Sequence, residues 1–158
     1  MLIELTGPDM VRATNACLIA SANAIDRGYH DRREGISAYQ GFRFHLQGAM
    51  AELAVSIALK LPWSDENREF KTDVGDIEVR SRGGTSLLFS LREYELRKHQ
   101  PGQKFVFATV DMDSALVTLN GWATIGHLRH HWRTTKYDSY ERYLIDPRDL
   151  HDIGTVLL

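Results

Sequence analysis

The first apolar repeat along the chain indicates a helix near the amino terminus. Residues 6–9 (Thr-Gly-Pro-Asp) combine a capping hydroxyl, a proline for the first turn and an acid that suits the positive end of a helix dipole. Apolar residues then recur every seven positions at Val11, Leu18 and Ile25. This spacing predicts a helix that extends to about Asp26, with those three residues on its apolar stripe. Cys17 and Ala22 lie beside them, and Cys17 is expected to be a small core residue.

The second helical repeat covers Phe44–Leu61 and ends at Pro62. Small residues at positions 48, 49, 51 and 54 would let this helix approach a sheet closely. Glu52 stands among them, and a carboxylate on a close-packed face is costly unless a partner compensates it. Two interpretations follow. Either Glu52 faces water at the polar border of the helix, or it points into a site that acids from elsewhere in the chain share.

Alternating apolar residues in the middle of the chain predict a strand over 76–82, with Ile77 and Val79 on one face. The glycine pair at 83–84 predicts a hairpin turn, and residues 85–91 are predicted to form the second strand of this hairpin. The charged stretch 92–103 closes with a Pro-Gly pair and is predicted to be a loop.

Two further strands are expected after this loop. Residues 104–111 are nearly all apolar, which is typical of a central strand, and residues 115–125 predict the next strand, with a bulge or kink at the Asn-Gly pair 120–121. Residues 126–132 predict a short helix, and the apolar end of the chain is expected to dock on the body. The predicted fold is therefore α+β: one domain over 1–158, with helices on a mixed sheet of about four strands.

Composition and charge narrow the classes of protein that fit. Of the 158 residues, 43% are hydrophobic and 25% charged, which is ordinary for a globular domain. A net charge of −2 provides no global basic field, so nucleic-acid contacts would need a local patch. The single cysteine, Cys17, excludes an internal disulfide framework and a multi-cysteine zinc site. Signal-peptide features and bilayer-length apolar runs are missing, so we expect a cytoplasmic protein with no membrane partner.

The candidate chemistry lies in the first predicted strand and the turn before it. Asp76, Glu78 and Arg80 share the face opposite Ile77, beside Asp73 of the preceding turn. Carboxylates on a strand edge, with a cation two residues on, can hold Mg²⁺ and bind a phosphate. Local pattern alone leaves an alternative, a solvated edge strand whose opposite charges neutralise each other.

A basic, partly aromatic strip lies at and after the short helix predicted over 126–132. Three histidines fall between positions 127 and 131, but no further ligand is evident at metal spacing, so zinc is the weaker interpretation. We interpret the strip as a surface that can lie along a phosphate backbone. The candidate nucleic-acid contacts are Arg129, His130 and Arg133 of this strip and Arg82 of the first predicted strand.

The order of these features resembles the PD-(D/E)XK nuclease superfamily, and in particular its small phage and bacterial members with a DVGxxxVR strand motif. The matching stretches are 48–55, 73–80, 104–111 and the Gly-Trp pair 121–122, so the resemblance covers roughly residues 44–132. It implies a restriction-endonuclease-like core and a phage or bacterial nuclease that hydrolyses DNA, with Mg²⁺ or Mn²⁺ as cofactor.

The resemblance also implies roles for individual residues. Asp73 and Glu78 would bind the metal, with Glu52 as the helix carboxylate. Asp76 would be a spare ligand that can replace Asp73. Arg80 stands where most members have lysine, and arginine can hold a phosphate but cannot take a proton from water. Two functions therefore stay open: an active phosphodiesterase in which Arg80 acts electrostatically, or an inactive descendant that binds nucleic acid or a partner protein.

A geometric question separates these hypotheses from an accidental motif. If Glu52, Asp73 and Glu78 converge within reach of one metal ion, the nuclease interpretation gains support. If they lie far apart, a structural or host-interaction role fits better. The sequence indicates no oligomeric state.

Overall fold

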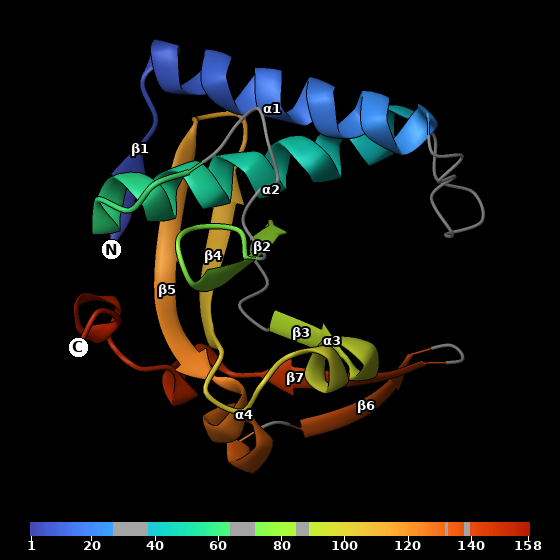
Figure 1. The fold of residues 1–158 in the computed structure, drawn as a ribbon, viewed down its shortest axis with the longest axis vertical. Helices are drawn as coiled ribbons and strands as arrows, with labels where there is room; N and C mark the ends of the chain where they lie inside the picture. The colour runs from blue at the N-terminus through green and yellow to red at the C-terminus, as the bar shows by residue number, and fades with distance from the viewer. Residues whose placement is uncertain (27–37, 64–71, 85–88, 132, 138–139) are drawn as a thin grey trace.

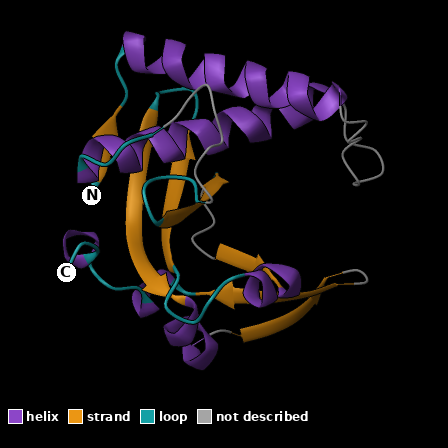
Figure 2. Cartoon of the chain, in the orientation of Figure 1, coloured by secondary structure: helices purple, strands orange, loops and turns teal. Residues whose placement is uncertain are grey.

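In the computed structural model, one long helix packs on a face of a four-stranded mixed sheet, a second long helix packs on the first, and a smaller sheet lies beyond (Figures 1 and 2). The structure describes residues 1–26, 38–63, 72–84, 89–131, 133–137 and 140–158. The helices are α1 (Gly7–Asp26), α2 (Ala38–Leu59), α3 (Glu93–Lys98) and α4 (Ile125–His131), with the 3-10 turns η1 (Pro147–Asp149) and η2 (Ile153–Thr155). The strands are β1 (Leu2–Glu4), β2 (Ile77–Gly83), β3 (Phe89–Arg92), β4 (Lys104–Asp111), β5 (Leu116–Thr124), β6 (Arg133–Tyr137) and β7 (Tyr140–Ile145). The predicted α+β class and mixed four-stranded sheet are confirmed.

The larger sheet has the strand order β1-β5-β4-β2, with β2 at its edge. β4 is antiparallel to β5 and parallel to β2. Its bounds are those predicted, and its place between two strands confirms it as a central strand. The predicted bulge is also present: Phe107 pairs with Gly121 and Ala108 pairs with Leu119, which leaves Asn120 as the extra residue.

The expected hairpin after β2 is wrong. β2 pairs in parallel with β4, whereas β3 joins β7 and β6 in a separate three-stranded sheet. The predicted loop over 92–103 also contains α3, in which Glu93 and Arg97 form an ion pair at helical spacing. Gly84 does turn the chain, with a φ of +82°, but the two strands have other partners. β2 pairs with β4 on one side and accepts the Asp73 carboxylate on its other edge, and β3 pairs with β7.

The amino-terminal helix begins and ends as predicted. Thr6 and Asp9 form a reciprocal cap, in which the Thr6 N–H donates to Asp9 Oδ2 (2.9 Å) and the Asp9 N–H donates to Thr6 Oγ1 (3.4 Å). The predicted apolar stripe is wrong for Val11 and Leu18, which are 60% and 52% exposed, whereas Cys17 beside them is buried.

The face of α1 that packs on α2 carries small residues. Ala13 and Cys17 are buried there, and the Cys17 thiol donates to the Phe42 carbonyl oxygen of α2. Small side chains let the two helices approach closely, which explains why the larger residues of α1 are left on the outside. Cys17 is a buried small residue, as expected.

α2 connects α1 to the sheet. It begins at Ala38, earlier than predicted, and runs antiparallel to α1 (Figure 1). Met50, Leu53 and Ala54 are buried against Ile77 and Val79 of β2, whereas Ile57 is exposed. Of the small residues predicted to allow close packing, Ala49, Ala51 and Ala54 are buried in this core. None of the helices that the structure describes has the length and apolar character needed to cross a membrane.

The carboxyl-terminal segment docks on β5, as expected. Trp122 and His151 exchange two backbone hydrogen bonds (3.1 and 2.8 Å), and Ile153 and Val156 are buried in the same core as the apolar residues of α2. A Cβ at Gly121 would lie 2.6 Å from the His151 carbonyl oxygen, so this close approach requires glycine.

Candidate functional site

The turn before β2 carries Asp73 back along the outer edge of that strand. Val74 and Ile77 exchange backbone hydrogen bonds (3.0 and 2.9 Å), and the Thr72 hydroxyl donates to the Gly75 carbonyl oxygen. Gly75 has a φ of +56°, a conformation that glycine adopts without strain. The Asp-Val-Gly sequence thus forms a tight, hydrogen-bonded turn that presents the Asp73 side chain to β2.

Asp73 binds the strand that follows it. Its Oδ2 accepts a hydrogen bond from the Val79 N–H (2.8 Å) and lies 3.5 Å from Arg80 Nη1. β2 is an edge strand, so this N–H points away from β4, and the carboxylate occupies the position that a further strand would take. Asp73 therefore has a structural role as well as a charge.

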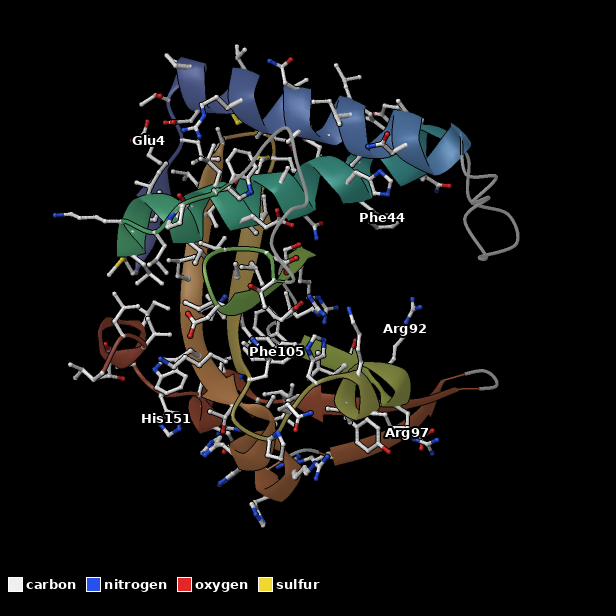
Figure 3. The ribbon with its side chains drawn as sticks, in the orientation of Figure 1. Glu4, Phe44, Arg92, Arg97, Phe105 and His151 are labelled. Atoms are coloured by element: carbon white, nitrogen blue, oxygen red, sulfur yellow. The ribbon has the colours of Figure 1, made fainter. Side chains whose placement is uncertain are left out.

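Glu78 is the buried charged residue of the described chain, with a side chain only 6% exposed. Strand alternation places Ile77 and Val79 on the α2 side of the sheet and Glu78 on the opposite side, next to Phe105 of β4. Figure 3 shows Phe105 in the interior of the molecule. A carboxylate in this apolar setting needs compensation.

Arg80 supplies much of that compensation. Its Nη2 lies 3.3 Å from Glu78 Oε2, and its Nη1 donates to the Val79 carbonyl oxygen (2.9 Å) as well as lying near Asp73. The guanidinium also sits 5.2 Å from the centre of the Phe105 ring, within cation–π range. One arginine therefore bridges the two carboxylates, with 26% of its side chain exposed.

The pKa of Glu78 reflects these surroundings. Burial raises it above the ordinary value, and the nearby Asp73 carboxylate raises it further. The Arg80 guanidinium and the Lys98 ammonium act in the opposite direction but do not cancel the rise. Asp73 and Glu78 thus lie close enough to repel each other, as two ligands of one cation would.

Sequence reasoning missed two residues at the end of α3. His99 is almost buried, with Nδ1 3.9 Å from Glu78 Oε1 and its ring edge-on to Phe105 at 5.2 Å. Lys98 lies near enough to act on the Glu78 charge. Both stand in the stretch predicted as a loop. The spacing of Glu93 and Arg97 was the available signal that a helix presents them.

The structure places Glu52 and Asp76 differently from Asp73 and Glu78. Glu52 lies on α2, on the other side of the sheet from Glu78, and its Oε2 accepts a hydrogen bond from the Trp63 indole N–H (3.0 Å). Asp76 is exposed, and its backbone carbonyl oxygen accepts from the Gln103 side-chain amide (2.7 Å). In the parts of the chain that the structure describes, no three His, Cys, Asp or Glu side chains form a group suited to a metal ion.

The predicted nucleic-acid contacts fall on two surfaces. Arg82 lies on β2, two residues beyond Arg80, whereas Arg129 and His130 are exposed on α4 and Arg133 is exposed at the start of β6. α4 follows Thr124, which pairs with Lys104, and Lys104 pairs with Ile77. The basic strip therefore begins at the same end of the sheet as the first residue of β2, but next to β5, which β4 separates from β2.

Two carboxylates are sufficient for some divalent cations. Mg²⁺ is commonly held by one or two protein carboxylates, with water and substrate phosphate as its remaining ligands. The Asp73 and Glu78 carboxylates, drawn together around one cationic group, fit that requirement. Glu52 would have to leave Trp63 to join them.

Comparison with protein-family models, with curated proteins and with solved structures found no match for this chain. The fold and site define an α+β protein in which an arginine bridges two carboxylates at the edge strand of a mixed sheet.

Proposed function

We propose that this protein is a metal-dependent phosphodiesterase that cleaves DNA, with a restriction-endonuclease-like core and Mg²⁺ or Mn²⁺ as cofactor. The observation that carries the proposal is the pair Asp73 and Glu78, which converge on Arg80 at the edge strand of the sheet. Carboxylates for a cation and a guanidinium for a phosphate are the groups that phosphodiester hydrolysis requires.

Each residue has a distinct part in this proposal. Asp73 and Glu78 hold the cation, and Arg80 pairs with a phosphate oxygen and stabilises the charge that develops there. When bound, a divalent ion lowers the pKa of a coordinated water and so supplies the nucleophile. Arg80 stays protonated throughout, so it acts by charge alone.

We assign DNA as the partner and the cytoplasm as the location. The basic side chains around the site support a polyanionic ligand. Arg82 continues the β2 face beyond Arg80, and Lys98 ends α3 beside Glu78. Arg92 extends outward from β3 (Figure 3).

A second function is favoured by a separate observation. Glu52, the third carboxylate that the resemblance implies, is bonded to Trp63 on the other side of the sheet, and Arg80 stands in place of the expected lysine. This arrangement suits a nuclease-fold module that has lost catalysis and binds nucleic acid or a partner protein. Salt-dependent DNA binding that survives the loss of Asp73 and Glu78 would identify it.

The test is cleavage of linear, nicked and single-stranded DNA with Mg²⁺ or Mn²⁺. We expect wild-type protein to cleave at least one substrate and Glu78→Ala to lose at least about a hundredfold in rate, since a bound ion contributes several kcal/mol to transition-state stabilisation. Glu93→Gln, which changes an exposed acid on α3, is the matched control and should cleave at the wild-type rate.

Two results would overturn the proposal: no cleavage by wild type with either ion, or equal cleavage by wild type and Glu78→Ala. Glu52→Gln separates the ligand sets. Its amide oxygen can still accept from Trp63, so the variant should fold, and unchanged cleavage would assign the metal to Asp73 and Glu78 alone.

A further inference from the structure

Arg80 lies where a cation bound by Asp73 and Glu78 would have to sit. Its two terminal nitrogens are 3.5 Å from Asp73 Oδ2 and 3.3 Å from Glu78 Oε2. A guanidinium is charged at every working pH, so it cannot give up this position by losing a proton. A divalent ion that approaches the same carboxylates must displace this positive charge.

A phosphodiester offers Arg80 an alternative partner. The planar guanidinium can bind two phosphate oxygens at once, and such bidentate pairs are among the strongest charge-assisted hydrogen bonds. The Arg80 and Asp73 side chains are 26% and 30% exposed, whereas the Glu78 side chain is only 6% exposed. Asp73 is held in place by the Val79 N–H (2.8 Å), and Glu78 is held by burial. Arg80 is therefore the member of the cluster that can turn toward a ligand while the carboxylates stay in place.

We propose that Arg80 is a built-in counter-ion of this site: its guanidinium pairs with Asp73 and Glu78 until a phosphodiester binds it instead. The divalent ion can then bind the two carboxylates, so the ion and the phosphodiester bind together. The phosphate both frees the carboxylates and adds an oxygen ligand for the ion. The protein alone then binds the ion weakly and binds it tightly in the presence of DNA. This inference rests on the proposed function, because it assigns the ion and the phosphate to the same site.

Coupling of this kind is reciprocal, so it can be measured by binding without any turnover. If DNA raises the affinity for the ion by a given factor, the ion raises the affinity for DNA by the same factor. We expect a factor of at least about ten, within the usual range of such couplings.

The experiment is a Mn²⁺ titration followed by electron paramagnetic resonance, with and without a short DNA duplex that has a phosphorothioate backbone. Wild type should bind Mn²⁺ at least about tenfold more tightly with the duplex. Arg80→Gln should bind Mn²⁺ more tightly than wild type in the absence of DNA, and the duplex should add little. Arg97→Gln, which removes the same charge from an exposed ion pair on α3, is the matched control and should leave the affinity for Mn²⁺ alone unchanged.

Arg80→Lys keeps the proposal testable if Arg80→Gln does not fold. Lysine is a compact, strongly hydrated charge on a flexible stem and lacks the planar fork of arginine, so it should hold the two carboxylates less firmly. Mn²⁺ affinity without DNA should therefore lie between those of wild type and Arg80→Gln. The inference is overturned if neither variant binds Mn²⁺ alone more tightly than wild type, or if Arg80→Gln retains the full effect of DNA. If the proposed function is wrong but the inference is right, DNA raises the affinity for Mn²⁺ but no DNA is cleaved. Cleavage without coupling overturns the inference alone.

Discussion

Asp73 allows a substitution series that separates structure from chemistry. In Asp73→Ala the Val79 N–H loses its acceptor and Arg80 loses one of its two carboxylates. A hydrogen bond to a charged group contributes about 1.5–3 kcal/mol net, and because water can reach this edge we expect the free energy of unfolding to fall by about 1–2 kcal/mol. For a chain of this size that loss lowers the melting temperature by about 2–8 °C.

Asp73→Asn keeps the acceptor and removes the charge. Its side-chain amide oxygen can accept from the Val79 N–H, so the unfolding free energy should stay within about 1 kcal/mol of wild type. Its Mn²⁺ affinity with DNA should nevertheless fall as far as that of Asp73→Ala, because a neutral amide is a poor ligand for a hard cation.

Urea denaturation at pH 7.5, followed by circular dichroism, measures the first effect, and Mn²⁺ titration measures the second. If Asp73→Ala is as stable as wild type, the bond to Val79 contributes nothing and the account of this turn is wrong. If Asp73→Asn binds Mn²⁺ as wild type does, Asp73 is not a metal ligand.

Two further predictions concern Glu78 and Gly121. Burial raises the pKa of Glu78 in the folded protein, so folding loses stability as pH rises above the ordinary glutamate pKa of about 4.3. Glu78→Gln should therefore melt at a higher temperature than wild type at pH 7.5 but not at pH 4, and a pH-independent difference would contradict this. Gly121→Ala would push a Cβ into the His151 carbonyl oxygen at a φ of +149° and should cost about 1–3 kcal/mol in urea denaturation. Gly102→Ala, with open space around it, should cost less than half as much.

Local patterns in the sequence predicted those features that depend on neighbouring residues. The reciprocal cap at Thr6 and Asp9, the bounds of β4 and the bulge at Asn120 all follow from short-range geometry. The exposed stripe at Val11 and Leu18 shows the limit of this reasoning. Helical periodicity identifies an apolar face, but α2 packs on the small residues of the neighbouring face instead.

Pairing between distant segments decided the sheet. A glycine pair after a strand predicts a hairpin from local turn preference, yet β2 lies parallel to β4, and β3 joins strands near the end of the chain. Local sequence carries no information about which distant edge is available, so the second sheet and the place of α3 were not predictable in this way.

The sequence alone indicated that Asp73, Glu78 and Arg80 come together, because a tight turn and strand alternation place them on neighbouring positions. Only the tertiary structure decided that Glu78 is buried, that His99 faces it and that Glu52 lies across the sheet, bonded to Trp63. The physical reason is that burial and the side of a sheet depend on which elements pack against it, and those elements come from distant parts of the chain.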